Sequence, residues 1–405
     1  MNRNFNLYEF IGEITGRKKS YFLKDIQKNK KKLSDRIDGK SVLVIGGAGT
    51  IGASFVKAIL HFKPAKVYVV DINENGLTEL VRDVRSSMDL NIPKDFITYP
   101  INFGDKIFRK IFASESPFDI VANFAAHKHV RSEKDHFSIE AMIENNVLKA
   151  KYLLDLLVEF PPQHFFCVST DKAANPVNVM GASKKLMEDV IMAYSSKLKI
   201  STARFANVAF SNGSLPFGFI ERLMKKQPLS SPSDVKRFFV SPEESGQLCM
   251  LACILGESGD IFFPKLDPEK DLKPFTLIAD GLLKKLGYEP DYCVSEQEAR
   301  DKAQLLKKNS KKYPVYYFSS DTSGEKPYEE FFTDKETLDL KKYQALGVVK
   351  NTPKKKMKEI DTIFARFDAL FNDENLDKQK VVQLLGEFVG NFEHIETGKS
   401  LDQKM

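Results

Sequence analysis

The sequence predicts an α/β protein with a doubly wound parallel sheet at its centre, and three observations support this prediction. From Ser41 onward, short apolar runs alternate with segments of helical periodicity. The connections between these elements are short, as in strand–helix–strand units, which place consecutive strands parallel and cover both faces of the sheet with helices. A glycine-rich turn follows the first apolar run and precedes a helical segment.

The expected strands and helices follow one another as far as residue 210, and this region forms the predicted sheet domain, 41–210. The expected strands are SVLVI (41–45), KVYVVD (66–71), FITYPI (96–101), FDIVANFAA (118–126), HFFCVS (164–169) and KISTARF (199–205). The longer expected helices cover residues 138–159 and 180–196.

Three further regions complete the predicted organisation. Residues 211–334 are mixed in character, with loops rich in Pro, Ser and Gly, and we expect a smaller C-terminal substrate-binding subdomain there. Residues 335–405 are predicted to be a helical extension, because apolar residues recur at helical spacing around Phe367 and Leu385. Residues 1–40 are predicted to be a basic extension with one or two short helices.

The composition excludes several classes of protein. With 405 residues, 42% hydrophobic and 29% charged, the chain can bury one large or two ordinary cores, and disordered or collagen-like classes are excluded. The net charge of +6 comes entirely from residues 1–40, which hold eleven basic and five acidic residues, whereas the rest of the chain holds 50 of each. A neutral body argues against nucleic-acid binding. The basic arm is expected on the protein's own surface or on a partner subunit, and it is also compatible with peripheral membrane contact.

The four cysteines predict a reduced, cytoplasmic protein. They form no CxxC pair, and neither a signal peptide nor a long apolar span is evident. Cys249 and Cys253 share a helix face inside an apolar run without further ligand residues, so we expect buried thiols and no metal site.

The glycine-rich turn predicts a dinucleotide site in a Rossmann-like sheet. Gly46, Gly49 and Gly52 let the backbone approach a pyrophosphate at the N-terminus of the helix that begins near Thr50 and Ile51. Asp71 closes the next strand, where it can accept hydrogen bonds from ribose hydroxyls and would repel a 2′-phosphate. NAD is therefore favoured over NADP, unless Arg82 reaches that phosphate.

The spacing GxxGxxG resembles the extended short-chain dehydrogenase/reductase superfamily. Asn102 stands where the superfamily usually has an Asp beside the adenine. The run NFAAHKHV (123–130) is similar to its loop beneath the nicotinamide ribose, which implies cofactor contacts from Ala125 and Ala126 and substrate contacts from His127 and Lys128. Asn146 matches a helix asparagine of the superfamily, although a packing role would place it there equally well.

Most of the candidate catalytic residues lie in the segment VSTDKAANPVNVMGASKKLME (168–188). In the superfamily, Tyr and Lys four residues apart leave one helix face, and the Lys holds the cofactor ribose and lowers the pKa of the Tyr. Lys184 is the matching Lys, but Met180 occupies the tyrosine position. A thioether cannot take a proton, so the ordinary dehydrogenase mechanism is excluded there.

Thr170, Asp171 and Lys172 precede this helix. Alone, they would be a solvated ion pair in a loop. The string STDKAANPVNVMGASK, however, resembles the nucleotide-sugar 4,6-dehydratases of polysaccharide biosynthesis, namely the UDP-N-acetylglucosamine 4,6-dehydratases, including the subgroup with Met for the catalytic Tyr.

Three later segments extend this resemblance over about residues 41–332. TARFANVAFSNGS (202–214) matches a family segment with Ala206 in place of Gly, and it implies substrate contacts from Asn207 and Ser214. KRFFVSPEES (236–245) implies Arg237 as the diphosphate ligand. SGEKPYEEF (323–331) implies Glu325 and Lys326, while Thr322 stands where an Arg is usual.

The resemblance implies redox-neutral dehydration of a UDP-N-acetylhexosamine to a 4-keto-6-deoxy sugar with C5 configuration retained, for surface-glycan amino sugars. We expect Lys172 as C5 base and Asp171 as C6 acid, with burial raising the pKa of Asp171 and lowering that of Lys172. Thr170 would help to deprotonate the C4 hydroxyl. The alternatives are a C5-inverting dehydratase, a 4-epimerase and a non-catalytic NAD-binding scaffold. A homo-oligomer formed through helices 138–159 and 180–196 is also implied.

Overall fold

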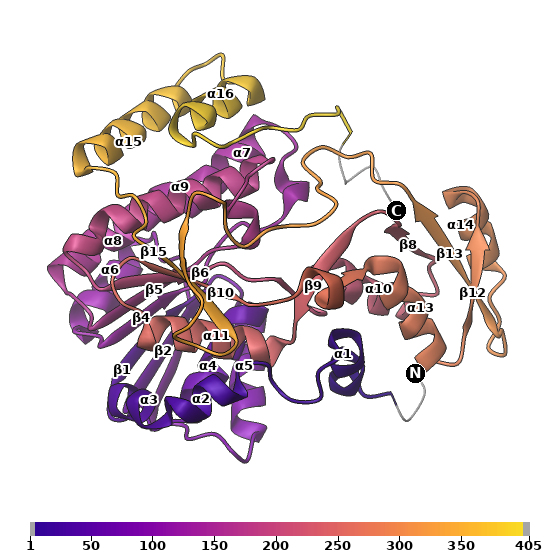
Figure 1. Ribbon diagram of the computed structural model, residues 1–405, viewed down its shortest axis with the longest axis horizontal. Coiled ribbons are helices and arrows are strands. Elements are labelled where there is room, and N and C mark those ends of the chain that lie inside the picture. Colours follow the sequence, from indigo (N-terminus) through magenta and orange to yellow (C-terminus); the bar gives the residue numbers. More distant parts are fainter. Residues whose placement is uncertain (1–4, 400–405) are drawn as a thin grey trace.

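A nine-stranded sheet lies at the centre of the protein in the computed structural model, which describes residues 5–399 (Figure 1). The strand order is β14-β15-β10-β6-β5-β4-β1-β2-β3. Strands β1 to β6 follow the order 3-2-1-4-5-6 of doubly wound sheets, with all neighbours parallel. This confirms the predicted fold class. Residues 1–4 and 400–405, at the ends of the two predicted extensions, lie outside the described residues.

The strands formed by the first half of the chain lie close to their predicted positions. They are β1 (Ser41–Ile45), β2 (Lys66–Asp71), β3 (Asp95–Pro100), β4 (Ile120–Asn123), β5 (His164–Val168) and β6 (Ile200–Ala203). β4 is shorter than its apolar run because Asn123 ends it. The Asn123 side-chain oxygen accepts a hydrogen bond from the Ala125 N–H at 3.0 Å, which turns the chain out of the sheet.

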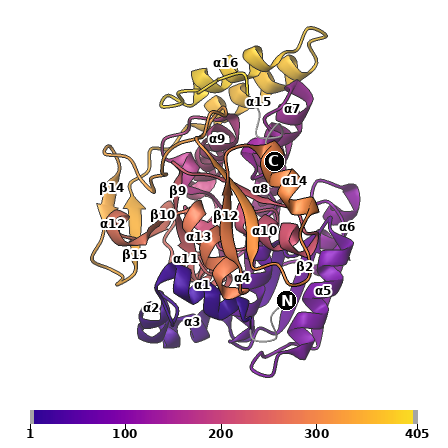
Figure 2. The same ribbon diagram turned by 90° about the vertical axis from the view of Figure 1, so that its right-hand side faces the viewer.

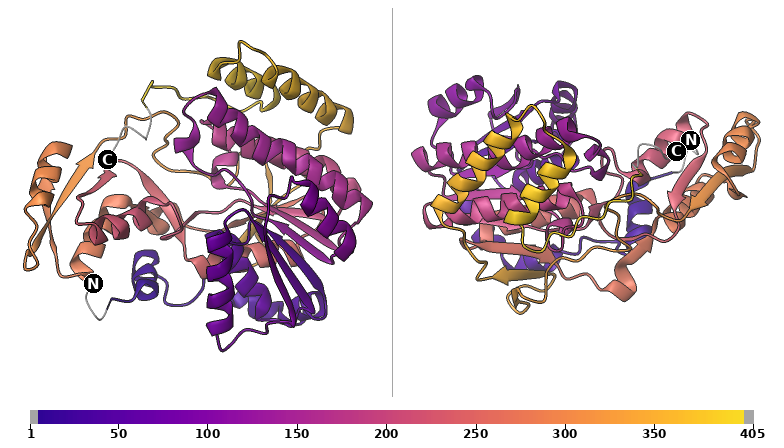
Figure 3. Two further views of the ribbon diagram at one scale, coloured as in Figure 1. Left: turned by 180° about the vertical axis from the view of Figure 1, so that it is seen from behind. Right: turned by 90° about the horizontal axis from the view of Figure 1, so that it is seen from above.

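Helices cover both faces of this sheet (Figures 1 and 3). They are α4 (Thr50–Leu60), α5 (Glu74–Ser86), α6 (Lys106–Glu115), α7 (His136–Ile143), α8 (Lys149–Glu159), α9 (Val179–Ala193) and α11 (Pro242–Leu255). A π-helical turn, Glu144–Leu148, joins α7 to α8, so the predicted helix 138–159 is interrupted there. Cys249 and Cys253 are free, buried thiols in α11, as predicted.

The large sheet includes strands from outside the predicted sheet domain. β10 (Asp260–Pro264) pairs parallel with β6, and β15 (Leu346–Lys350) and β14 (Thr337–Asp339) add antiparallel strands at the edge. The sheet therefore extends across both expected boundaries, at residues 210 and 335. β10 joins the large sheet because all five of its residues are buried. The helix α11, which precedes β10, forms the crossover that places β10 parallel to β6.

A smaller lobe lies beside the sheet (Figure 1) and faces the viewer in Figure 2, and it has its own hydrophobic core. Its helices are α10 (Leu215–Met224), α12 (Pro268–Asp271), α13 (Phe275–Lys285) and α14 (Glu296–Gln304). Its strands are β7 (Asn207–Val208), β8 (Leu229–Pro232), β9 (Lys236–Val240), β11 (Leu272–Pro274), β12 (Glu289–Cys293) and β13 (Lys312–Phe318), in two three-stranded sheets.

The basic N-terminal arm forms three helices that join the two lobes. These are α1 (Leu7–Thr15), α2 (Leu23–Lys28) and α3 (Lys30–Ile37), one more than predicted. α1 buries Phe10 and Ile14 in the core of the smaller lobe, whereas Phe22 and Leu33 are fully buried in the large core. Between them, Arg17 donates to both carboxylate oxygens of Glu244 at 2.9 Å. The arm is thus part of the packed body.

The C-terminal helices form a hairpin over the outer face of α9. α15 (Met357–Phe371) and α16 (Lys378–Phe388) confirm the predicted amphipathic helices, and their apolar residues Ile360, Phe367 and Leu385 are fully buried. The hairpin packs on α7 and α9 (Figure 3). Of the helices expected to pair with a second copy, α7 and α9 thus contact the chain's own C-terminal region.

Within the described residues, no helix combines the length and the apolar character that crossing a membrane requires.

Candidate active site

A cavity of about 200 Å³ lies between the glycine-rich turn, the ends of β2 and β3, and the loop after β4. Every residue predicted from the sequence to contact the adenosine and pyrophosphate lines it, together with the two small residues after β4. These residues are Gly46, Gly49, Thr50, Ile51, Gly52, Asp71, Asn102, Ala125 and Ala126. His127 and Lys128, expected at the substrate, line this cavity as well.

Two glycines make the narrow turn possible. Gly46 has a φ of +76°, and a Cβ there would lie 2.4 Å from the Ala125 nitrogen. A Cβ on Gly52 would lie 2.3 Å from the Gly46 carbonyl oxygen. The turn, α4 and the loop after β4 therefore meet at backbone distance, as a pyrophosphate cradle at a helix N-terminus requires.

Asp71 is held in place at the end of β2. Its carboxylate accepts the backbone N–H groups of Ala48 and Asn73, both at 2.9 Å, and still lines the cavity. Arg82 lies on the surface of α5, 3.8 Å from Glu79, and does not contribute to the cavity lining. An acidic residue at the end of β2, with Arg82 outside the cavity, fits the ribose diol of NAD and disfavours a 2′-phosphate.

We expect Gly52→Ala to weaken NAD binding by about tenfold to hundredfold, because the added methyl group forces the turn apart. Fluorescence titration of the purified variant with NADH measures this change. Gly218→Ala is the matched control, since a Cβ at that position in α10 meets nothing within 4 Å. Equal affinity in the two variants would contradict the assignment of the cradle.

A second cavity, of about 350 Å³, lies between the large sheet and the smaller lobe. It shares Ile51, Phe124, Ala126 and Lys128 with the first cavity, so the two adjoin. Its lining includes the predicted residues Thr170, Asp171, Lys172, Met180, Lys184, Asn207, Ser214, Arg237 and Glu325. Residues from the end of β5 and from the smaller lobe thus face one space.

Asp171 is the centre of the catalytic segment. Its Oδ1 accepts hydrogen bonds from Thr170 Oγ1 at 2.8 Å, from the Lys172 backbone N–H at 2.9 Å and from Lys172 Nζ at 3.2 Å. All three bonds reach the same oxygen, which leaves Oδ2 for a ligand in the cavity. A short 3₁₀ turn, Asp171–Ala173, holds this arrangement directly after β5.

Lys184 and Met180 enter the cavity from the first turns of α9. Lys184 Nζ donates to the Val168 carbonyl oxygen at 2.6 Å, and burial lowers the pKa of Lys184. Met180 is buried, and its thioether lies at the cavity wall. The helix begins at the Asn178 cap, whose side chain accepts the Gly181 N–H.

Glu329 is a site residue that the sequence analysis did not single out. It is 3% exposed, and its Oε1 lies 3.6 Å from Lys172 Nζ and 3.9 Å from the Arg237 guanidinium. Burial raises the pKa of Glu329. The adjacent glutamates of SGEKPYEEF were the available signal, but only the tertiary structure brings one of them to Lys172.

The predicted lowering of the pKa of Lys172 is wrong. Burial opposes its positive charge, but the neighbouring carboxylates of Asp171 and Glu329 outweigh burial and raise the pKa of Lys172 above its usual value. Without substrate, Lys172 therefore carries a proton at neutral pH.

Arg237 is buried and its guanidinium is already engaged. It donates to the carbonyl oxygens of Lys236 and Lys326 at 2.9 Å and binds the Glu325 carboxylate. An incoming diphosphate would have to replace Glu325 as its anionic partner. Lys326 pairs with Glu330 at 3.7 Å and does not contribute to the lining of either cavity. The structure therefore does not bring Lys326 to the site.

Asn146 fixes the loop after β4. It lies in the π-helical turn, accepts the His127 N–H at 2.8 Å and donates to the His127 carbonyl at 2.9 Å and to Ser183 Oγ at 3.0 Å. These three bonds tie the loop shared by both cavities to α9. Asn146 is thus a positioning residue, which a π-turn at this place allows.

The chain belongs to the family described as "Polysaccharide biosynthesis protein", whose model matches residues 42–351. This family and relatives named UDP-N-acetylglucosamine 4,6-dehydratase support a short-chain dehydrogenase/reductase of the nucleotide-sugar dehydratase branch. An uncharacterized membrane protein of Methanocaldococcus jannaschii is 31% identical over 88% of this chain and 98% of its own length. UDP-N-acetylglucosamine 4,6-dehydratase (inverting) of Campylobacter jejuni is 28% identical over 58% of this chain and 69% of its own length.

Other relatives are longer than this protein: the chain spans less than half the length of its Bacillus subtilis and Staphylococcus aureus polysaccharide-biosynthesis relatives. Among solved structures, Pen from Bacillus thuringiensis has a TM-score of 0.59 and 21% identity, and the match covers 79% of this chain and 90% of that chain. This likeness supports the fold.

Proposed function

We propose that the protein is an NAD-dependent nucleotide-sugar 4,6-dehydratase acting on a UDP-N-acetylhexosamine, with UDP-N-acetylglucosamine as the first substrate to test. One observation carries the proposal. Lys172, Asp171 and Thr170 face a cavity that adjoins the dinucleotide cradle, and the residue at the usual tyrosine position is Met180. The acid and base must therefore come from the end of β5.

NAD is the proposed cofactor, held by the glycine turn, Asp71 and Lys184. When bound, it supplies a hydride acceptor and donor for C4 and C6 of the sugar. The C4 hydroxyl proton passes to Asp171, which delivers a proton to the departing C6 hydroxyl, while Lys172 removes the C5 proton and returns a proton to C5 when hydride reaches C6. Thr170, whose hydroxyl is bonded to Asp171, assists deprotonation at the C4 hydroxyl.

Retention of configuration at C5 is the favoured outcome. Retention requires that C5 is reprotonated on the face from which its proton was removed, and in this proposal a single group that lines the cavity, Lys172, performs both transfers. The alternatives are an inverting dehydratase, as in the Campylobacter relative, and a 4-epimerase. A scaffold that binds NAD without turnover is the alternative of another class.

Incubation with UDP-N-acetylglucosamine should give a product lighter by one water, detected by mass spectrometry, and NMR of the trapped product should report the C5 configuration. A mass-neutral isomer would instead indicate the epimerase. If none of a panel of UDP- and GDP-N-acetylhexosamines turns over while NAD binds, the scaffold is favoured and the proposal fails.

Glu329→Gln should move the acidic limb of the kcat/KM–pH profile to lower pH. Lys172 must lose its proton before it can act as base, and Glu329 is one of three carboxylates that raise its pKa. Removing that negative charge lowers the pKa of Lys172, so the neutral amine exists at lower pH. Glu330→Gln is the control, because Glu330 binds Lys326 and Asn175 instead. An acidic limb at the same pH in Glu329→Gln and wild type would exclude Lys172 as the group that titrates.

A further inference from the structure

The chain segment that follows α16, residues 390–397, lies between the catalytic segment and the loop that follows β13. We call it the strap. It leaves the hairpin that covers α7 and α9 and runs toward the smaller lobe (Figures 1 and 3). Residues 352–405, which include the strap, lie outside the part of the chain that the family model matches.

On one side, the strap bonds to the loop between Lys172 and α9. The backbone N–H of Glu393 donates to the Pro176 carbonyl oxygen at 3.1 Å, and that of Ile395 donates to the Val177 carbonyl oxygen at 3.0 Å. The side chain of Asn391 donates to the Ala174 carbonyl oxygen at 2.7 Å. These three bonds attach the strap to the loop that separates Lys172 from α9.

On the other side, the strap bonds to the loop that leads to Glu325 and Glu329. The Gly324 N–H donates to the Ile395 carbonyl oxygen at 2.9 Å, and the Thr397 N–H donates to Ser323 Oγ at 3.0 Å. Ser323 Oγ in turn donates to Glu396 at 2.6 Å. Ile395 therefore bonds both loops at once, through its N–H and its carbonyl group.

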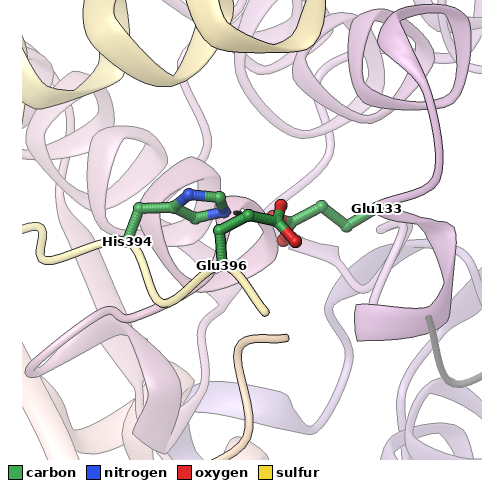
Figure 4. Close-up of side chains that lie close together, drawn as sticks. All are labelled: Glu133, His394 and Glu396. Carbon is green, nitrogen blue, oxygen red and sulfur yellow. Dashed lines mark hydrogen bonds and ion pairs between the residues drawn. The ribbon is translucent and has the colours of Figure 1, made fainter. Parts of the chain in front are cut away.

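A cluster of charged and polar side chains connects the strap to the N-terminus of α9, and Figure 4 shows three of them, Glu133, His394 and Glu396. The Glu133 carboxylate accepts the Val179 N–H at 2.8 Å, the first amide of α9, and its other oxygen bonds His394 Nε2. Lys378 Nζ lies 3.6 Å from the same oxygen and also binds Glu396. Glu133, His394 and Glu396 place ligand atoms within 4.8 Å of one another, but the Lys378 ammonium supplies the positive charge there. The cluster is a network of ion pairs.

We propose that the strap is a positioning element of the active site. It sets the separation between the Asp171–Lys172 turn and the loop carrying Glu325 and Glu329, and so keeps Glu329 beside Lys172 and Glu325 beside Arg237. The catalytic consequence rests on the proposed function, whereas the structural consequence does not. Asn391 and His394 act through these loops, so they are positioning residues.

A chain ending after Val389 tests the proposal, because it keeps the buried residues of α15 and α16 and removes the strap. We expect kcat to fall by about a hundredfold, as for a displacement of about 1 Å at the reacting groups, with NAD affinity unchanged. Hydrogen exchange gives a readout independent of turnover: the Gly324 amide should lose its protection, because its acceptor is the Ile395 carbonyl.

Point variants keep the test meaningful if the truncated chain fails to fold. His394→Ala should lower kcat, and His394→Gln, which retains an N–H donor toward Glu133, should recover part of it. Arg366→Ala is the control in the same extension, where Arg366 forms an exposed pair with Glu387. Unchanged Gly324 exchange and unchanged kcat in the strap variants would overturn the proposal. Lost Gly324 protection in a protein without turnover on any nucleotide sugar would support the strap and reject the dehydratase.

Discussion

Lys172→Met should lower kcat on UDP-N-acetylglucosamine by about 10²–10⁴-fold, the range expected for loss of a general base. Methionine keeps much of the side-chain volume but cannot accept a proton. NAD affinity should change little, because Lys172 lines the substrate cavity and not the dinucleotide cradle. Steady-state kinetics and NADH titration of the same preparation measure the two effects.

Heavy water reports the proton transfer at C5. Because loss of water requires loss of the C5 proton, product formed in heavy water should carry deuterium at C5, and Lys172→Met should form this labelled product only at its residual rate. Lys302→Met is the matched control, because Lys302 binds Asp291 and Glu298 in the smaller lobe, outside both cavities. Formation of labelled product by Lys172→Met at the wild-type rate would remove Lys172 as the C5 base.

Arg204→Met should lower the free energy of unfolding by about 3–5 kcal/mol, the largest stability change expected in the protein. Arg204 is completely buried. It donates to both oxygens of Glu188, at 2.9 and 2.7 Å, and to both oxygens of Glu336, each at 2.9 Å. Losing the guanidinium leaves the fully buried Glu188 with only the Ser169 hydroxyl, at 2.6 Å, and the Lys185 ammonium, at 3.9 Å, as partners. Urea denaturation followed by circular dichroism measures the change.

An exposed pair of the same type provides the control for this prediction. Arg366 binds Glu387 across α15 and α16, with about half of each side chain exposed, so Arg366→Met should change the unfolding free energy by less than about 1 kcal/mol. Similar losses for Arg204→Met and Arg366→Met would show that burial does not decide the contribution of these pairs. A small loss for Arg204→Met alone would show that Glu188 is neutralised in another way.

The elements predicted correctly are those whose signal lies within a short stretch of chain. β1, β2 and the glycine turn follow from apolar runs and glycine spacing, and α15 and α16 follow from helical periodicity. β10 was missed because its run DIFFP stands among Pro- and Ser-rich loops, and periodicity does not say which sheet a strand joins. The length of β4 depended on one side-chain hydrogen bond of Asn123.

For the candidate active site too, some residues could be predicted from the sequence and others could not. Sequence spacing placed Gly46, Asp71, Asp171, Lys172 and Lys184 along two cavities that do adjoin in the structure. It did not indicate that Glu329 lies beside Lys172, and it therefore predicted the wrong direction for the pKa of Lys172. That direction depends on which carboxylates lie within a few ångströms, and one of them comes from a distant segment.

The sequence by itself determined the fold class, the glycine-rich turn and the side chains that follow β5, because each of these features depends on residues that are close together in the chain. Only the tertiary structure decided which distant residues meet. It places Glu329 beside Lys172, pairs Glu188 with Arg204 and bonds the strap to both active-site loops. Hydrogen bonds and charge interactions act over a few ångströms in space, whatever the separation along the chain. The basic N-terminal arm is the clearest case, since its charge suggested a polyanion while its apolar residues pack it into both lobes.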